Sequence, residues 1–253
     1  MITASGSVMH GAVDEVFRLA SLSKPITAWA TLIAVEEGSV ALDEPAGQPG
    51  CTVRHLLAHA GGYGFDSPGP ITKPERNRMY SNTGIEVLAE HVATRTGVAF
   101  EVYVSEAVIE PLGMTSTTPR GSPAKSFRGT VRDLAVFAAE LLRPRLIAPA
   151  TAIAATSVQF PELGGILPGV GRFRPNPWGL GLEIRGHKSP HWTGTQNSPA
   201  TFGHFGGSGT FLWVDPVAEV ACVMLANREF TEWGLEWWPP FSDAVLAELG
   251  TSR

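Results

Sequence analysis

The chain has 253 residues, 43% of them hydrophobic and 17% charged, which is an ordinary globular composition and enough length to bury one large core or two modest ones. Its 19 basic and 24 acidic residues give a net charge of -5 without any run of lysine or arginine, which argues against a nucleic-acid partner. No stretch approaches the roughly 20 apolar residues of a membrane span, and the first residues lack the pattern of a secretory signal.

The two cysteines, Cys51 and Cys222, lie far apart and lack metal-ligand spacing, so we expect buried free thiols. Free thiols are typical of a reducing compartment, which predicts a cytoplasmic protein. His55 and His59 are one helical turn apart, but without a third ligand we expect them to order a loop. The sequence therefore predicts neither a metal nor a cofactor.

The first long helix is predicted directly after Ser21. Apolar residues recur at helical spacing from Ile26 to Ala34, and Gly38 can close the helix. Pro25 is tolerated because the first helical turn has no partner for its missing N–H group. Ser21 is thus expected at a helix N-terminus, where free N–H groups and the helix dipole favour an oxyanion.

The middle of the chain is predicted to be mainly helical, because apolar residues recur there at helical spacing. Residues 64–77, rich in proline, glycine and charge, are expected to form an exposed loop. We expect a single domain over residues 1–253, with a helical subdomain at roughly residues 45–150. The predicted helices are residues 53–59, 83–96, 100–108 and 130–142.

The last part of the chain is predicted to contain strands. Alternation over residues 178–184 predicts one strand, and residues 211–214 and 220–225 predict two more, joined by a short turn. Residues 237–249 predict a final helix. This order of elements predicts an α/β (α+β) fold, with a mostly antiparallel sheet flanked by helices.

Ser21-Leu22-Ser23-Lys24 places a hydroxyl and an amine three residues apart, on one face of the predicted helix. A serine hydroxyl is a weak nucleophile unless a neighbouring group takes its proton. Burial and nearby positive charge favour a neutral lysine amine, which can do so. The spacing therefore indicates a nucleophile with its own base.

Two other motifs have structural explanations when each is taken alone. In Tyr80-Ser81-Asn82, Ser81 or Asn82 is suited to cap the following helix, and Tyr80 to pack. Residues 203–209 contain four glycines in seven residues, which permits a bulge or a close approach of backbone to a ligand. His204 alone indicates a structural histidine.

Taken together, Ser21-x-x-Lys24, Tyr80-x-Asn82 and His204-Phe205-Gly206 occur in a characteristic order. In this the chain resembles the active-site serine β-lactamase and penicillin-binding protein superfamily. The resemblance is to its class C-like branch, which includes class C β-lactamases, family VIII carboxylesterases and D-stereospecific peptidases. It implies a β-lactamase/transpeptidase-like fold. The phrases Pro111-Leu112-Gly113-Met114 and Trp213-Val214-Asp215-Pro216 extend the resemblance.

The resemblance implies a role for each motif residue. Ser21 would be the acylated nucleophile, Lys24 its proton partner, and Tyr80 the general base that also activates water in deacylation. Asn82 would orient the lysine or a substrate amide. The third motif, His204, Phe205 and Gly206, would bind substrate, and the N–H groups of Ser21 and Gly207 would form an oxyanion hole.

The third motif departs from the pattern of relatives that hydrolyse β-lactams well. They usually carry Lys-Thr-Gly there, with the cation facing the substrate carboxylate. A neutral imidazole and a phenyl ring at His204 and Phe205 fit an uncharged or apolar substrate better, which favours ester hydrolysis.

The N-terminal region is also shorter than the family pattern, because only 20 residues precede Ser21. The family normally has two strands there, and residues before Val13 are expected to supply one short strand at most. Either the sheet is trimmed, or a partner chain covers the open edge in a homo-oligomer.

The sequence therefore predicts a serine hydrolase that forms an acyl-enzyme on Ser21 and acts on a small ester or amide. Two alternatives stay open. One is a β-lactamase or D-alanyl carboxypeptidase, which needs a cation such as Arg172, Arg174 or Lys188 for a charged substrate. The other is a non-turnover binding or sensor protein of the same fold.

Overall fold

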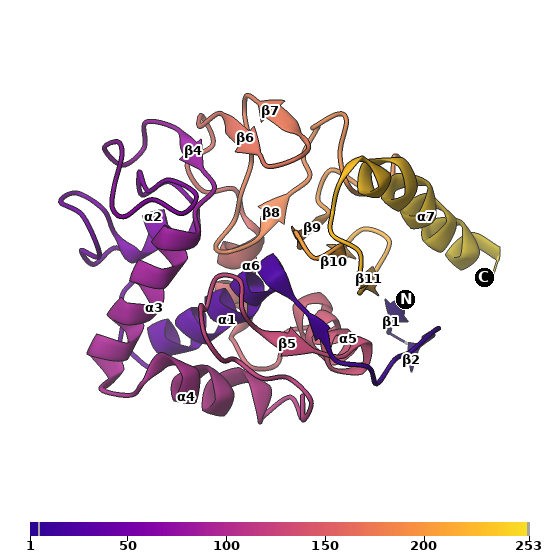
Figure 1. Ribbon diagram of the computed structural model, residues 1–253, viewed down its shortest axis with the longest axis horizontal. Helices are drawn as coiled ribbons and strands as arrows, with labels where there is room; N and C mark the ends of the chain where they lie inside the picture. The colour runs from indigo at the N-terminus through magenta and orange to yellow at the C-terminus, as the bar shows by residue number, and fades with distance from the viewer. Residues whose placement is uncertain (5, 252–253) are drawn as a thin grey trace.

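The computed structural model describes residues 1–4 and 6–251, in which helices and short strands alternate around a central sheet (Figure 1). The helices are η1 (Ala20–Leu22), α1 (Ser23–Glu36), α2 (Val53–Leu57), α3 (Asn82–Thr96), α4 (Phe100–Val104), the π-helical η2 (Ser105–Ile109), α5 (Val131–Leu142), α6 (Pro149–Thr156) and α7 (Glu232–Thr251). The strands are β1 (Ile2–Thr3), β2 (Gly6–Ser7), β3 (Phe17–Arg18), β4 (Arg78–Met79), β5 (Arg128–Gly129), β6 (Gly165–Leu167), β7 (Gly171–Phe173), β8 (Glu183–Ile184), β9 (Phe202–Gly206), β10 (Thr210–Asp215) and β11 (Val220–Met224).

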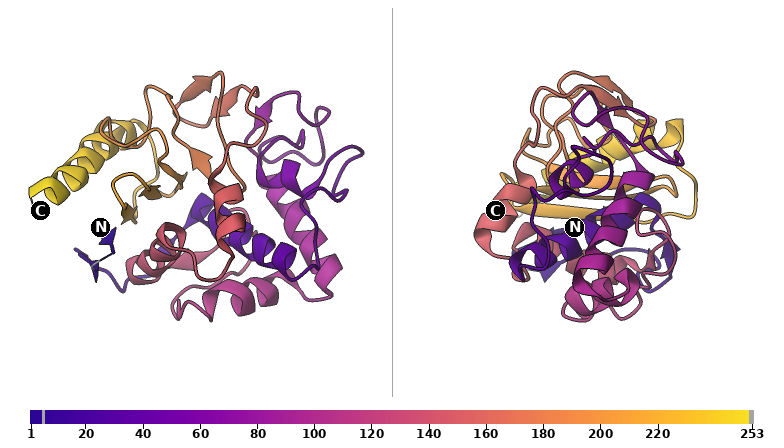
Figure 2. Two further views of the ribbon diagram at one scale, coloured as in Figure 1. Left: turned by 180° about the vertical axis from the view of Figure 1, so that it is seen from behind. Right: turned by 90° about the vertical axis from the view of Figure 1, so that its left-hand side faces the viewer.

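The main sheet has the strand order β2-β1-β11-β10-β9-β8, and every pairing in it is antiparallel. Side chains of β10 alternate between two cores, as expected for a strand covered on both faces. Leu212 and Val214 join the main core, whereas Phe211 and Trp213 join a second, aromatic core with Trp238 of α7. Figures 1 and 2 show α7 along one face of the sheet and α5 along the other.

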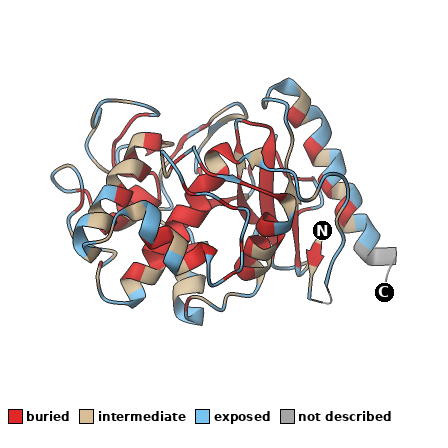
Figure 3. Cartoon of the chain, turned by 60° about the horizontal axis from the view of Figure 1, so that its bottom comes forward, coloured by how far each residue is buried: buried red, intermediate tan, exposed pale blue. Residues whose placement is uncertain are grey.

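The rest of the molecule is a group of helices around α1, beside the sheet (Figure 1). Helix α1 is buried on nearly all sides, and residues Ser23 to Leu32 are all buried. Figure 3 shows that buried residues gather in the interior, while the outer helices expose their far faces. Lys24 of the serine motif therefore lies in an enclosed helix, and Ser21 lies in η1 directly before it. Within the described residues, no helix is both long and apolar enough to cross a membrane.

Most predicted elements are confirmed, including the helices at α1, α3 and α5 and the β10–β11 hairpin. The strand predicted over residues 178–184 is mostly wrong, because only Glu183 and Ile184 pair with β9. Gly181 has a φ of 81°, a left-handed conformation that ends an extended strand. The final helix begins at Glu232, earlier than predicted, and contains both Pro239 and Pro240.

The N-terminal region holds two strands ahead of the serine motif in the main sheet, so the prediction of at most one is wrong. Each has only two residues, and Ile2 pairs with both Ser7 of β2 and Ala221 of β11. Gly6 has a φ of 146°, which glycine adopts without strain, and this helps the chain fold back on itself. The strand region is shortened, as predicted, but not reduced to a single strand.

Candidate active site

Ser21 and Lys24 lie at the junction of η1 and α1. Lys24 Nζ is 3.2 Å from Ser21 Oγ, 2.6 Å from Asn82 Oδ1 and 2.9 Å from the Ala124 carbonyl oxygen. A neutral amine has two N–H donors and one lone pair. The amide and carbonyl oxygens can only accept, so they take the two donors and leave the lone pair for the Ser21 hydroxyl proton. The contacts are those of a base beside its nucleophile.

Lys24 is fully buried, and burial holds the pKa of its amine well below the usual value. Asp66 and Glu86 act in the opposite direction, while Lys125 adds to the lowering. Desolvation is the largest of these effects, because a charged ammonium loses its hydration in the protein interior. The neutral amine is therefore favoured.

Asn82 is held between Lys24 and a surface ion pair. Its Nδ2 donates to Asp66 Oδ1 at 3.0 Å, and Asp66 in turn accepts from Lys125 Nζ at 2.6 Å. Ser81, rather than Asn82, caps α3 by accepting from the Gly84 N–H at 2.8 Å. The capping expected for this motif is therefore present at Ser81, and Asn82 is free to face the lysine.

Tyr80 follows β4, and its ring lies 4.6 Å from Lys24 Nζ. Burial raises the pKa of its hydroxyl, and an interaction with the Ser21 hydroxyl acts in the opposite direction. The ring is packed in an aromatic cluster with centroids 4.8 to 5.9 Å away. This cluster is formed by His59, Phe65, Trp178 and His204. The raised pKa favours the protonated phenol, and the surrounding rings fix its position.

The third motif lies on β9, against the segment before Ser21. His204 Nδ1 donates to the Phe205 carbonyl oxygen at 2.7 Å, so Nδ1 carries the proton of the neutral ring. Burial, followed by the charge of Lys24, lowers the pKa of His204 to about 3. A side chain at Gly206 would lie 2.6 Å from the Leu19 carbonyl oxygen, so this position requires glycine. The motif offers a neutral imidazole and no cation.

A cavity of about 180 Å³ connects these motifs. Gly207 faces open space, since no atom lies within 4 Å of a Cβ built on it. The lining is mainly aromatic and aliphatic, with the Ser21 hydroxyl at one side. The lining residues are Ser21, Phe65, Tyr80, Leu167, Pro168, Gly169, Trp178, Glu183, His204, Phe205, Gly207 and Phe230.

Glu183 is the one carboxylate in this lining, and a buried lysine balances its charge. It forms an ion pair with Lys188, and it accepts from His191 Nε2 and Trp192 Nε1, both at 3.1 Å. Burial raises its pKa, but Lys188 and His191 outweigh this and lower it to about 2. Lys188 is thus committed to Glu183 and does not supply the cation of the charged-substrate alternative.

The two other candidate cations are exposed. Arg172 lines a second groove, which shares Phe65, Tyr80 and Pro168 with the cavity. Arg172 belongs to β7, and Arg174 directly follows that strand. A cation is therefore available beside Tyr80 in the neighbouring groove, although none comes from the third motif.

His55 and His59 do not converge on a metal. His55 Nε2 pairs with Glu75 at 2.9 Å and its Nδ1 faces Thr52, whereas His59 Nδ1 accepts from the Ser81 N–H at 3.3 Å. Across residues 1–4 and 6–251, no three His, Cys, Asp or Glu side chains are gathered as metal ligands. Both histidines order loops, as predicted, and Cys51 and Cys222 are buried free thiols.

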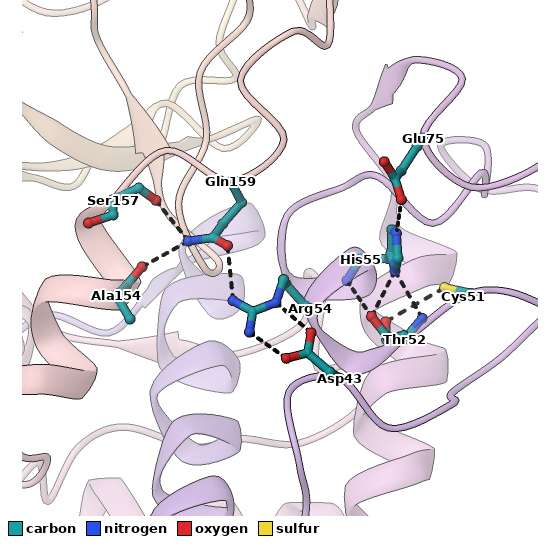
Figure 4. Close-up of polar contacts among 9 residues, drawn as sticks. All are labelled: Asp43, Cys51, Thr52, Arg54, His55, Glu75, Ala154, Ser157 and Gln159. Atoms are coloured by element: carbon teal, nitrogen blue, oxygen red, sulfur yellow. Dashed lines mark hydrogen bonds and ion pairs between the residues drawn. The ribbon is translucent and has the colours of Figure 1, made fainter.

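A polar network links Arg54 of α2 to Asp43 and to Gln159 (Figure 4). Arg54 binds both carboxylate oxygens of Asp43, at 2.7 and 2.8 Å, and reaches Gln159 Oε1 at 3.1 Å. The Gln159 N–H donates to the Trp178 carbonyl oxygen at 2.8 Å. The aromatic wall of the cavity is therefore anchored to the helical part of the molecule.

The structure thus brings together every site residue that the sequence predicted, and the cavity lining adds others that the sequence did not indicate as site residues. Among these are Phe65, Trp178, Glu183 and Phe230. His59, expected only to order a loop, lies just beyond α2 and packs against Tyr80. Glu183 reaches the cavity from β8 and the other three from separate loops, and no local pattern marks them as site residues.

Residues 4–238 match the family model described as Beta-lactamase. A crystal structure described as a beta-lactamase from Mycobacterium bovis has a TM-score of 0.96 and 54% identity, over 98% of this chain and 93% of that one. This confirms the β-lactamase/transpeptidase-like fold. The chain therefore belongs to the Beta-lactamase family, as the three motifs predicted.

Curated relatives include hydrolases of other specificities. The D-alanyl-D-alanine-carboxypeptidase/endopeptidase AmpH of Escherichia coli is 25% identical over 168 residues, 52% of this chain and 44% of that protein. Esterase EstB of Burkholderia gladioli is 39% identical over 66 residues, 21% of this chain and 17% of that protein. The chain spans less than half the length of these curated relatives. Family membership thus indicates a hydrolase without fixing its substrate.

Proposed function

We propose that the chain is a serine hydrolase that forms an acyl-enzyme on Ser21 and acts on small, uncharged esters or amides. The observation that carries this proposal is the buried Lys24, whose lone pair is left for the Ser21 hydroxyl by its two other contacts. The neutral third motif and the mainly apolar cavity support an uncharged acyl group.

In the proposed acylation, Ser21 Oγ attacks the carbonyl carbon and its proton passes to Lys24 Nζ. The oxyanion lies near the N–H groups of Ser21 and Gly207, each donor contributing about 2.7–4 kcal/mol. Tyr80 gives its proton to the leaving oxygen or nitrogen and regains one from Lys24. In deacylation, water loses a proton to this pair, attacks the ester, and Ser21 leaves protonated.

The raised pKa of Tyr80 changes one expected role. A phenol that stays protonated is a poor base but a good proton donor, whereas the amine of Lys24 has a lowered pKa. We therefore propose Lys24 as the base in acylation and Tyr80 as the acid, in place of the reverse assignment drawn from the resemblance.

The test compares wild type with Ser21→Ala on p-nitrophenyl acetate, p-nitrophenyl butyrate and nitrocefin, with intact mass of the protein after each reaction. Ester turnover that is lost in the variant, with little nitrocefin cleavage, is expected. A transient mass increase on Ser21 should accompany it. Equal rates in wild type and variant would contradict the proposal, and a persistent adduct without turnover would favour the sensor alternative.

A second candidate is a β-lactamase or D-alanyl carboxypeptidase. It is favoured by Arg172, an exposed cation that lines the same groove as Tyr80 and could bind a substrate carboxylate. The relatives described as a beta-lactamase and as AmpH support it as well. Nitrocefin or D-alanyl-D-alanine peptide turnover that exceeds ester turnover and falls in Arg172→Gln would establish this candidate.

The proposal includes a cytoplasmic location, which follows from the free thiols, and a homo-oligomer formed through the exposed outer strand β2. Light scattering after size exclusion tests the oligomer. A monomer mass for the full chain at micromolar concentration would contradict it.

A further inference from the structure

Phe230, near the C-terminal end of the chain, forms part of the cavity wall. It lies between β11 and α7, and its ring packs against Phe205 at 4.9 Å and Trp238 at 4.8 Å between centroids. Phe205 belongs to the third motif and Trp238 to α7. The ring therefore bridges the motif and the C-terminal helix at the edge of the cavity.

Two glycines leave the space that this ring occupies. A Cβ built on Gly169 would lie 2.7 Å from Phe230 Cε1, and one built on Gly234 would lie 2.5 Å from Cε2. Real Cβ atoms do not approach so closely, so neither position admits a side chain while the ring stays in place. The ring fills the gap between the β6–β7 hairpin, where Gly169 lies, and the first turn of α7.

The backbone of Phe230 is tied to the proposed oxyanion hole. Its N–H donates to the Gly207 carbonyl oxygen at 2.8 Å. The Phe230 backbone is thereby positioned relative to Gly207, which lines the same cavity as Ser21. The ring itself is held by its packing against Phe205 and Trp238.

The wall also lies where the cavity meets solvent. Gly169 is exposed and Phe230 half-buried, whereas Leu167 and Trp178 at the interior side are 2% and 1% exposed. Leu167 and Trp178 therefore form buried parts of the lining, and the Phe230 ring forms a partly exposed part beside Gly169.

We propose that Phe230 is a specificity-determining residue that sets the upper length of the acyl group and restricts this site to short, uncharged acyl chains. The inference rests on the proposed hydrolase function of Ser21. The position of the ring supports it, because Phe230 lines the same cavity as Ser21 and fills the gap between Gly169 and Gly234.

The test measures kcat/KM of wild type, Phe230→Leu and Phe230→Met on p-nitrophenyl acetate, butyrate, hexanoate, octanoate and decanoate. Wild type should prefer the short esters. Phe230→Leu should raise the octanoate-to-acetate ratio by about tenfold or more, a typical effect of added space in an apolar pocket. Phe230→Met, whose longer unbranched side chain can still reach into the place of the ring, should raise it less. Phe241→Leu is the matched control, since Phe241 lies on α7 and lines a different cavity.

A second readout does not need turnover. p-Nitrophenyl alkylphosphonates with short and long alkyl chains should label Ser21, with the rate followed by intact mass. An unchanged chain-length profile in both Phe230 variants, with Ser21-dependent hydrolysis intact, would overturn the inference and leave the proposed function standing. Absence of both hydrolysis and labelling in wild type would overturn the proposed function and the inference with it.

Discussion

The two sides of the cavity differ in how their polar groups are satisfied. On the Lys24 side, the amine, the Asn82 amide and the Asp66 carboxylate form one continuous set of hydrogen bonds. On the third-motif side, His204 Nε2 and Trp178 Nε1 have no hydrogen-bond partner among the described residues. In the proposed reaction, the first side would hold the proton acceptor and the second would face the acyl group. On that proposal, chemistry and substrate choice are carried by different residues, and we expect that each can be changed separately.

The largest expected effect is loss of the base in Lys24→Met. Removal of a positioned proton acceptor should lower kcat/KM for p-nitrophenyl butyrate by about 10²- to 10⁴-fold. The melting temperature should fall modestly, because methionine leaves Asn82 Oδ1 and the Ala124 carbonyl oxygen without the donor that Lys24 supplies. Lys73→Met makes the same change at an exposed lysine in the loop before β4. It should alter kcat/KM little, and comparable losses in both variants would argue against Lys24 as the base.

The next effect concerns stability on the third-motif side. Glu183→Gln leaves Lys188 as a buried charge without its carboxylate, which should cost about 3–5 kcal/mol of unfolding free energy. Glu183→Gln combined with Lys188→Met should recover much of the loss, because no buried charge remains. Urea unfolding of the three proteins measures this. A double variant no more stable than the single one would mean that the carboxylate has a role beyond charge balance.

The same ion pair gives a pH dependence with a defined sign. The folded pKa of Glu183 is about 2, below the model-compound value of 4.5. The carboxylate therefore contributes stability that is fully present above about pH 4.5 and is lost as the pH falls through about 2. Glu183→Gln should flatten the unfolding free energy across this window. An equally steep acid decline in the variant would assign the decline to other carboxylates.

The sequence predicted the polar side of the site better than the apolar side. Ser21 and Lys24 are one helical turn apart, so local geometry determines their contact, and the motif order relates them to Tyr80 and His204. Phe230 reaches the cavity through tertiary packing against Gly169, a contact between distant loops that leaves no periodic signal.

The fold shows the same limit. Periodicity was sufficient for α1, α3 and α5, whose apolar stripes face the core. It failed over residues 178–184, where alternating side chains are buried but Gly181 turns the backbone away from a continuous strand. Alternation predicts a strand with one buried face, and strand pairing additionally requires an extended backbone.

The smallest expected effect is a displaced pH profile in Asn82→Asp, which tests whether the hydrogen-bonded side tunes the base. Asn82 Oδ1 is 2.6 Å from Lys24 Nζ, so a carboxylate there would favour the ammonium form and raise the lysine pKa. If Lys24 acts as a neutral base, activity depends on its unprotonated fraction. The acid limb of kcat/KM should then move to higher pH by about 1 to 3 pH units, with activity recovering under alkaline conditions.

The matched control is Asn77→Asp, which adds the same charge at an exposed position in the loop before β4 and should leave the profile in place. Loss of activity in Asn82→Asp at all pH values, without displacement of the limb, would mean that Asn82 orients substrate and does not tune the amine. If the acid limb moves equally in both variants, the added negative charge itself is the cause, because a change in net charge acts on every titrating group at the site. Only a displacement seen in Asn82→Asp and not in Asn77→Asp would show that the contact with Asn82 sets the pKa of Lys24.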